Sequence, residues 1–200
     1  MKLAITGANG HLGRRLIKTL KDQHEIIAIV RSSAARQRLA QEVGGLVTVV
    51  ECDYGNAASL AAVLADVDYV VHLPGIIKES RANTFQMAHE DAAAALLLAT
   101  AGTKVQGILY LSILGAHIDS TNACLASKAR AEKLLLAGVV PARMIKVPMV
   151  LGEGDFASRA LAKKARRSLN LDFHAASLEQ PIYAGDVIAA IISSVNGEPS

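Results

Sequence analysis

Short apolar runs alternate with stretches of helical periodicity along most of the chain. The runs are aliphatic and β-branched with few charges, which is typical of strands buried on both faces of a parallel sheet. Strands are predicted at residues 3–6, 26–30, 47–51, 69–73, 108–112 and 144–147. Helices are predicted between them, at 12–21, 34–42, 57–64, 85–100 and 125–137. This alternation predicts an α/β fold in which helices cover both faces of one parallel sheet.

Three glycines follow the first predicted strand in a G-x-x-G-x-x-G spacing, and a predicted helix follows them at once. Strand, glycine turn and helix in this order form a seat for the pyrophosphate of a dinucleotide. Gly7 permits the tight turn, Gly10 lets the backbone approach the phosphates, and Gly13 lets the helix pack closely. The free N–H groups at the helix N-terminus attract the anion. The predicted cradle consists of Gly7, Asn9, Gly10, His11, Leu12 and Gly13.

The alternation of strands and helices loosens after Gly152. The elements predicted there are a helix at 156–169, extended pieces at 171–173 and 181–183, and a last helix at 187–194. We interpret residues 151–200 as a short C-terminal extension on the substrate side, so residues 1–200 are predicted as a single NAD(P)-binding domain. The predicted fold is therefore a Rossmann-type, doubly wound parallel sheet with that extension.

The residue at the end of the second predicted strand bears on the choice of dinucleotide. Many dinucleotide folds place an acid there to bind the ribose 2′-hydroxyl, whereas this chain has Arg31. An arginine fork binds a 2′-phosphate that an acid would repel. The sequence therefore predicts NADP(H) in preference to NAD(H), the alternative being that Arg31 is a solvated residue at a strand end.

Polar and small residues close the third and fourth predicted strands. Asp53 and Tyr54 follow the third strand, where a carboxylate can accept from the adenine amino group and a side chain can flank the ring. Leu73, Pro74 and Gly75 close the fourth strand, where a small or rigid backbone can pass beneath the nicotinamide ribose. Ligands of doubly wound sheets lie beyond the carboxyl ends of the strands, so these residues complete the predicted cofactor site.

Composition narrows the classes of partner. Of 200 residues, 52% are hydrophobic and 20% are charged, which favours a well-buried fold over disorder. A net charge of +3 does not indicate nucleic acid as a partner. No apolar stretch reaches the roughly 18–20 residues of a transmembrane segment, and the chain enters its first strand at Lys2, so no signal peptide is expected.

The cysteines and histidines show no ligand spacing. Cys52 and Cys124 form no C-x-x-C pair, and the six histidines are scattered, so no metal site is predicted. Reduced thiols in the cytoplasm are the expected state of both cysteines. A basic cluster at 163–167 is interpreted as a solvated helix face, with an anionic partner, either a nucleotide-sugar diphosphate or an acidic lipid headgroup, as the alternative.

Motifs spread over nearly the whole chain resemble one family. They lie at 6–13, 30–31, 72–75, 110–116, 127–132, 147–152 and 182–187. The chain resembles an atypical short-chain dehydrogenase/reductase of the NAD-dependent epimerase/dehydratase group. Residues 75–85, followed by His89 and its neighbours, are similar to the branch of the NADPH-binding accessory subunit of respiratory complex I. That resemblance implies tightly held NADPH, often without known turnover, and a protein partner complex.

The resemblance also implies a chemistry site. Enzymes of the family use a Ser or Thr at the end of the fifth strand and a Tyr-x-x-x-Lys pair on the next helix, in which Tyr exchanges a proton with the substrate. Ser112 and Lys128 occupy matching positions, but Cys124 stands where the tyrosine is expected. A nearby lysine is expected to bring the thiol pKa into a useful range, yet the thiol is shorter than tyrosine by a whole ring. The candidate catalytic residues are Ser112, Cys124 and Lys128.

Two functions stay open from the sequence. One is an NADP(H)-binding protein with weak or absent catalysis, cytoplasmic or peripheral to a membrane complex, whose cofactor serves structure, sensing or assembly. The other is an active NAD(P)-dependent reductase or nucleotide-sugar epimerase/dehydratase in which Cys124 or a water replaces tyrosine. Ser112 fits a substrate donor and a plain strand-end hydroxyl equally, whereas Lys128 fits a ribose ligand better than a solvated lysine.

Overall fold

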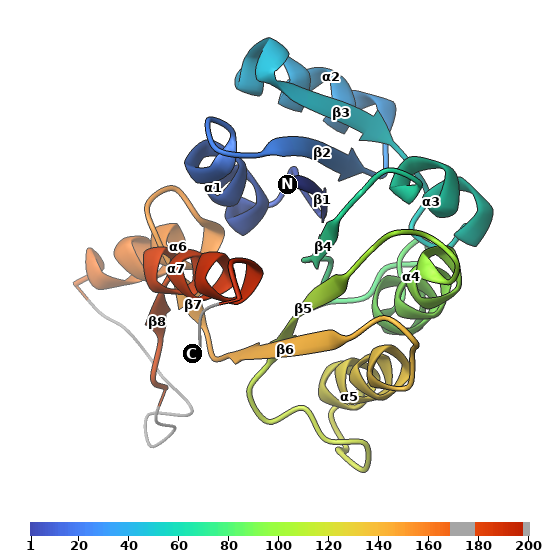
Figure 1. The fold of residues 1–200 in the computed structure, drawn as a ribbon. Helices are drawn as coiled ribbons and strands as arrows, with labels where there is room; N and C mark the ends of the chain where they lie inside the picture. The colour runs from blue at the N-terminus through green and yellow to red at the C-terminus, as the bar shows by residue number, and fades with distance from the viewer. Residues whose placement is uncertain (169–178, 198–200) are drawn as a thin grey trace.

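Six parallel strands form the central sheet, in the order β3-β2-β1-β4-β5-β6 (Figure 1). The computed structural model describes residues 1–168 and 179–197. The strands are β1 (Lys2–Thr6), β2 (Glu25–Val30), β3 (Val47–Glu51), β4 (Tyr69–His72), β5 (Gly107–Ile113) and β6 (Ala142–Val147). All six predicted strands are confirmed, with ends that shift by two residues at most. The strand order reverses beside β1, where doubly wound sheets bind their ligands.

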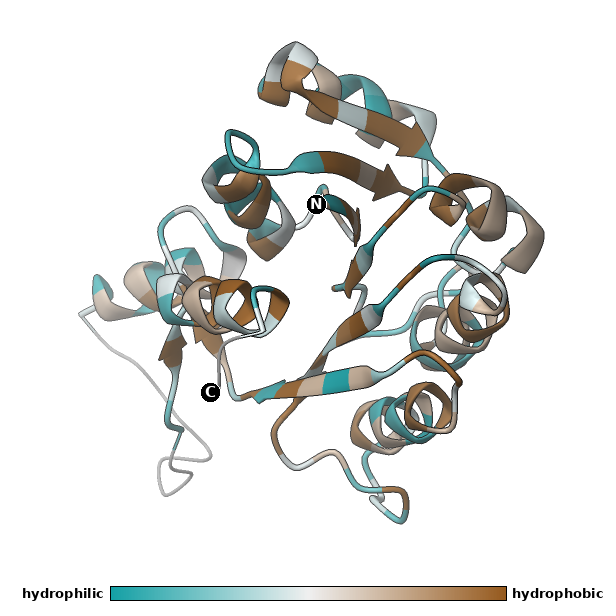
Figure 2. Ribbon diagram, in the orientation of Figure 1, coloured by the Kyte–Doolittle hydropathy of each residue, from teal (hydrophilic) through white to brown (hydrophobic). Residues whose placement is uncertain are grey.

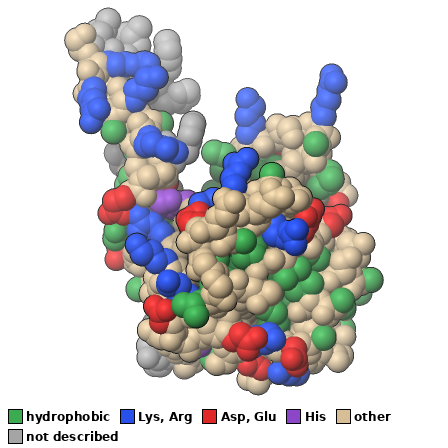
Figure 3. Space-filling model, turned by 90° about the horizontal axis from the view of Figure 1, so that it is seen from above, with side chains coloured by type: hydrophobic (Ala, Val, Ile, Leu, Met, Phe, Trp, Pro, Cys, Tyr) green, Lys and Arg blue, Asp and Glu red, His purple; other side chains and the backbone are tan. Residues whose placement is uncertain are grey.

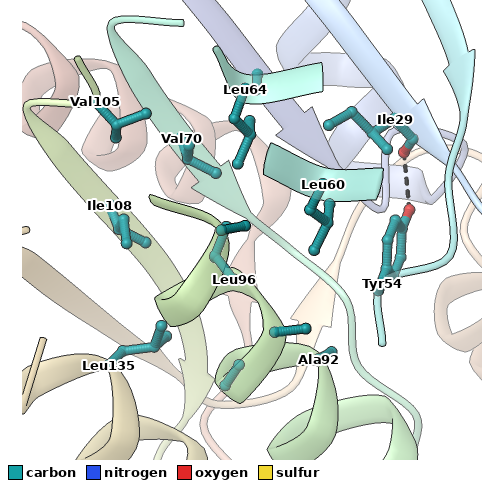
Figure 4. Packing of buried hydrophobic residues seen from close by; sticks show 14 of the residues in the cluster. Ile29, Tyr54, Leu60, Leu64, Val70, Ala92, Leu96, Val105, Ile108 and Leu135 are labelled. Carbon is teal, nitrogen blue, oxygen red and sulfur yellow. Dashed lines mark hydrogen bonds between the residues drawn. The ribbon is translucent and has the colours of Figure 1, made fainter. Parts of the chain in front are cut away.

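Helices cover both faces of this sheet. They are α1 (His11–Leu20), α2 (Ser33–Val43), α3 (Ala57–Leu64), α4 (Ala92–Thr100), α5 (Ala123–Leu136) and α7 (Ala184–Val195). Apolar residues of α3, α4 and α5 form one buried cluster with the sheet (Figure 4). Those of α1, α2 and α7 form a second cluster on the opposite face. The predicted Rossmann-type, doubly wound fold is therefore confirmed.

Strand side chains supply both clusters in alternation. In β1, Ala4 belongs to the cluster on the α3–α5 side, whereas its neighbours Leu3 and Ile5 belong to the other. Because neighbouring side chains point to opposite faces, a strand buried on both sides must be apolar throughout. Figure 2 shows brown strands at the centre of the molecule, whereas α1, α2 and α5 combine brown and teal residues.

The predicted helix at 85–100 is divided in the structure. A π-helical turn, η2 (Gln86–Asp91), precedes α4. The turn carries His89, which is fully buried and has hydrogen-bond partners at both ring nitrogens. A π turn places one more residue in a helical turn than an α-helix does, and such turns often occur at functional sites.

The C-terminal part departs most from the expected pattern. β7 (Val150–Leu151) was not predicted, and it pairs in parallel with β8 (Ile182–Tyr183), which matches the extended piece predicted at 181–183. α6 (Phe156–Ala165) ends four residues before its predicted end at 169. Like charges three and four positions apart among residues 163–167 weaken a last helical turn. Residue 169 and the piece predicted at 171–173 lie outside the described residues.

Basic side chains gather along α6 at the edge of the molecule (Figure 3). Arg159, Lys163 and Arg166 are all exposed. Exposure of these side chains agrees with the interpretation of this segment as a solvated helix face. Within residues 1–168 and 179–197, no helix is long and apolar enough to cross a membrane.

Candidate cofactor and chemistry site

The three glycines form a turn at the carboxyl end of β1. Gly7 has a φ of +70°, a conformation that favours glycine. A Cβ placed on Gly13 would lie 2.6 Å from the carbonyl oxygen of Gly7 and 2.7 Å from that of Ala8. The close approach predicted for Gly13 is therefore present, although the helix packs on the turn itself rather than on the strand. It brings the first turn of α1 directly against the glycine loop.

The N-terminus of α1 has no side-chain cap, a feature it shares with α7, whereas several other helices are capped. Side chains of Ser32, Asn56, Asn122 and Asp155 cap α2, α3, α5 and α6. The residue before α1, at the N-cap position, is Gly10, which has no side chain to cap the helix. Its first N–H groups therefore keep their capacity to bind an anion, and the absence of Cβ atoms leaves room for it. This cradle fits the pyrophosphate of a dinucleotide.

The other residues of the predicted cradle surround this turn. Asn9 is exposed, and its carbonyl oxygen accepts from Nε of Arg14 at 2.9 Å. Leu12 is partly buried against the cluster on the α1 side. The ring of His11 accepts from Nε of Arg15 at 3.1 Å, so the ring has a partner within its own helix. The backbone N–H of His11 is the group placed in the first turn of α1.

Tyr54 connects the glycine turn to β2 through its hydroxyl group. Its side chain is buried, and its hydroxyl accepts from the N–H of Gly7 at 2.7 Å and donates to the carbonyl of Ile29 at 2.8 Å (Figure 4). Burial raises the pKa of this phenol to about 12. The expected place beside an adenine ring is therefore corrected for Tyr54, because its ring points into the core. Asp53 is exposed at the rim, where its carboxylate accepts from the N–H of Gly55.

Arg31 is exposed at the carboxyl end of β2 and has two partners. Its Nη1 donates to Oδ1 of Asn83 at 3.0 Å. Its guanidinium carbon lies 5.7 Å from the ring centroid of Tyr54. Asn83 belongs to the loop between β4 and η2, and sequence reasoning did not select it. The only signal was its place within 75–85, the segment that carries the resemblance to the complex I branch.

The end of β4 brings the turn and α5 together. A Cβ on Gly7 would lie 3.2 Å from the nitrogen of Pro74 and 3.3 Å from the carbonyl carbon of Leu73. A Cβ on Gly75 would lie 3.3 Å from Nζ of Lys128. The predicted residues of β1, β4 and α5 thus converge at one edge of the sheet.

Lys128 is buried at this point of convergence. Only 7% of its surface is exposed, and its Nζ donates to the carbonyl oxygens of Pro74 at 3.1 Å and Leu111 at 2.9 Å. The same nitrogen lies 4.4 Å from the ring centroid of Tyr110. Burial lowers the pKa of Lys128 to about 8, because the charged form loses hydration. An ammonium has three hydrogens, so one remains beyond the two carbonyl bonds.

The other two candidate catalytic residues have internal partners. The Sγ of Cys124 donates to the carbonyl of Ile76 at 3.5 Å. Burial raises the pKa of this thiol more than Lys128 lowers it, so the expected activation of the thiol by Lys128 is wrong in direction. The hydroxyl of Ser112 is buried and donates to Oε1 of Glu132. Glu132 in turn pairs with Lys146, so Ser112 matches the strand-end alternative.

His89 connects the loop after β4 to the start of α5. Its Nε2 accepts from the N–H of Ile76 at 3.1 Å, so the proton resides on Nδ1, which donates to Oγ of Ser127 at 2.8 Å. Ser127 donates onward to the carbonyl of Cys124 at 2.9 Å. Burial lowers the pKa of His89 to about 4, which keeps the ring neutral. Sequence reasoning missed this role, for which the only signal was the motif beginning at residue 89.

Comparison with known proteins identifies the family of the chain. A family profile described as NAD(P)H-binding matches residues 7–140. The chain belongs to the NAD(P)H-binding family. Together with its relatives and its fold, the match identifies an epimerase/dehydratase-like short-chain dehydrogenase/reductase.

Two curated relatives illustrate the range of this family. The chain is 29% identical to the mitochondrial NADH dehydrogenase [ubiquinone] 1 alpha subcomplex subunit 9 of Arabidopsis thaliana, over 98% of this chain and 50% of the relative. It is 32% identical to quinone oxidoreductase 2 of Escherichia coli, over 69% of this chain and 46% of the relative. The chain thus spans about half the length of these relatives. The resemblance to the complex I subunit is confirmed.

A solved structure supports the fold. The Bordetella bronchiseptica enzyme WbmG in complex with NAD superposes with a TM-score of 0.81 at 20% sequence identity. The match covers 100% of this chain and 70% of WbmG.

In residues 1–168 and 179–197, no group of three or more His, Cys, Asp or Glu side chains could hold a metal ion.

Proposed function

We propose that this protein holds NADP(H) with weak or absent turnover, and that the bound cofactor serves structure, sensing or assembly. The observation that carries the proposal is Cys124, which occupies the position of the family's proton-donating tyrosine. Its thiol is bonded to a backbone carbonyl, and its pKa is raised. A general acid must come within about 3.2 Å of the substrate atom, or within one water of it, and a thiol is too short for that reach.

The binding half of the proposal rests on the cradle. The N–H groups of α1 would hold the pyrophosphate, Arg31 a 2′-phosphate, and Lys128 the nicotinamide ribose through its remaining hydrogen. Asp53 at the rim would accept from the adenine amino group. When bound in its reduced form, the nicotinamide would supply a hydride to an acceptor. The chain's own residues then bind and orient the cofactor without offering a proton to that acceptor.

A ligand that binds only the folded state stabilises it by mass action. Binding at a hundred times its Kd adds about 2.7 kcal/mol. A tightly held cofactor would therefore keep the sheet edge and its loops in one conformation for a protein partner. We propose that such a protein resides in the cytoplasm and, by analogy with the mitochondrial subunit named above, binds at the surface of a larger complex.

The first experiment is to purify the protein without added cofactor, denature it, and identify any released nucleotide by mass spectrometry. We expect stoichiometric NADPH in its reduced form, because the chemistry end offers no proton donor for turnover. Empty protein, or a mixture of oxidised and reduced nucleotide, would contradict retention and favour the active reductase instead. The reductase alternative draws support from quinone oxidoreductase 2 among the relatives.

The second experiment tests the choice of cofactor. Arg31→Asp should shift the preference from NADPH toward NADH, because a carboxylate repels the 2′-phosphate and accepts from a 2′-hydroxyl. Lys133→Asp makes the same change of charge at an exposed position in the last turn of α5 and is the matched control. An unchanged ratio of the two dissociation constants in Arg31→Asp would exclude the assignment of Arg31.

A further inference from the structure

The side chain of Arg31 is restrained although it is exposed. The ring of Tyr54 lies at one side of its guanidinium, at 5.7 Å, and Oδ1 of Asn83 accepts from its Nη1 at 3.0 Å. An exposed arginine ordinarily samples many rotamers, and ordering it for a ligand costs conformational entropy. Here two contacts, one from Tyr54 after β3 and one from Asn83 in the loop after β4, restrict that freedom before any ligand arrives.

Asn83 is itself held independently of Arg31. The backbone of Asn83 exchanges two hydrogen bonds with the backbone of Ser80, at 3.1 and 3.2 Å. The carboxylate of Glu79 accepts from the N–H of Phe85 at 2.7 Å and closes the same loop. These bonds use no atom of the Asn83 side chain. The loop therefore presents the amide to Arg31 as a fixed acceptor.

The contact leaves most of the guanidinium available. Arginine has five N–H donors in a planar fork, and the bond to Asn83 uses one donor on Nη1. The edge formed by Nε and Nη2 remains, and that edge matches two oxygens of a phosphate. An amide acceptor at Nη1 thus orients the fork without competing for it.

We propose that Asn83 is a positioning residue for cofactor specificity, which holds Arg31 so that its free edge receives the 2′-phosphate of NADP(H). This inference rests on the proposed function, since it requires that Arg31 bind that phosphate. Asn83 acts only through Arg31. Its removal therefore costs affinity for NADPH and leaves affinity for NADH unchanged.

The test is a thermodynamic cycle on binding, measured by calorimetric titration of the whole protein with NADPH and with NADH. Asn83→Ala should weaken NADPH about tenfold, which corresponds to about 1.4 kcal/mol, while NADH stays within about twofold. In an Arg31→Ala background, Asn83→Ala should have no further effect. Ser80→Ala, which keeps both backbone bonds of the same turn, should bind both cofactors as the parent does.

Asn83→Asp tests whether the side chain at position 83 lies close to the bound 2′-phosphate. A carboxylate can still accept from Arg31, so a residue that only supports the loop would tolerate the change. Beside a 2′-phosphate the added negative charge repels, and we expect NADPH to weaken more than in Asn83→Ala. Melting temperatures without cofactor should stay unchanged in both variants, because the turn is held by backbone bonds.

The outcomes distinguish this inference from the proposed function. Equal weakening of NADPH and NADH by Asn83→Ala, or an undiminished effect without Arg31, would overturn the role of Asn83 alone. A preference that depends on Arg31 but not on Asn83 would do the same. A parent protein that binds both cofactors equally, or neither, would overturn the proposed function and this inference together.

Discussion

The glycine end and the chemistry end of the candidate site differ in how far the protein itself satisfies their polar groups. At the glycine turn, α1 begins without a side-chain cap, and its N–H groups remain able to bind a ligand. At the chemistry end, the polar side chains are already bonded within the protein: Lys128 to two carbonyls, Cys124 to a third, and Ser112 to Glu132. The glycine turn keeps N–H donors that can bind a ligand, whereas the chemistry end has satisfied most of its polar groups with partners inside the protein.

This difference separates binding from catalysis in one fold. A cofactor site needs donors that the protein leaves unsatisfied, because each bond to the ligand then replaces a bond to water. A proton-transfer site needs a group with reach and a pKa near the working pH. The glycine end meets the first condition, whereas the thiol of Cys124 meets neither part of the second. Membership of a dehydrogenase family therefore does not by itself imply turnover.

The largest effect is expected from a substitution in the glycine turn. Gly13→Ala would place a Cβ within 2.7 Å of two carbonyl oxygens, and the backbone must move to relieve the overlap. We expect the free energy of unfolding to fall by about 3 kcal/mol and NADPH binding to be lost. Chemical denaturation and calorimetric titration measure the two effects. Gly45→Ala, where no atom lies within 4 Å of the added Cβ, should change neither.

A smaller loss of stability is expected from a substitution at the chemistry end. Ser127→Ala removes the acceptor for the Nδ1–H of His89, and both residues are fully buried. An unsatisfied buried donor costs about 1–3 kcal/mol, so chemical denaturation should show a loss of about 2 kcal/mol. The exposed Ser59→Ala is the control and should leave stability unchanged. A neutral result for Ser127→Ala would mean that the chemistry end is less tightly bonded than the geometry indicates.

The pKa of Lys128 provides a third test, through the pH dependence of stability. This pKa is about 8 in the folded protein against an ordinary value of 10.5, so the unfolded chain holds its proton longer as pH rises. Below pH 8 both states are protonated and folding carries the whole penalty; between pH 8 and 10.5 the folded state loses its proton first and the penalty fades. Relative to Lys128→Met, the cofactor-free parent should therefore gain about 1.4 kcal/mol of stability per pH unit in that window. Denaturation curves of both proteins across the window give the difference, and a constant difference would exclude the lowered pKa.

The sequence was sufficient for the sheet and for the cradle because both depend on local patterns. Apolar runs locate the strands, and the glycine spacing locates the turn whose Cβ-free positions the structure reproduces at Gly7 and Gly13. Since parallel strands end at one edge, Gly75 and Lys128 could also be expected near each other, and they are.

What the sequence could not provide depends on long-range partners. Tyr54 lies just past β3, where strand alternation no longer decides which way a ring points, and it turned into the core. Asn83 contacts Arg31, which lies 52 positions away in the sequence, and His89 contacts Ser127, which lies 38 positions away. No local periodicity reveals such contacts. The pKa of Cys124 depends on whether burial or the nearby cation dominates, and only the packing around it decides that.

The short ladder between β7 and β8 has an evolutionary consequence. Val150 and Leu151 pair with Ile182 and Tyr183, so the two ends of the intervening segment lie side by side. Closing a loop between two fixed points costs only about 0.6 kcal/mol more for each doubling of its length. The ladder therefore fixes the two points between which one segment could be replaced by another. In a relative, a longer or differently charged segment could stand between these two points. It would change what reaches the cofactor site, while the nucleotide-binding sheet stays intact.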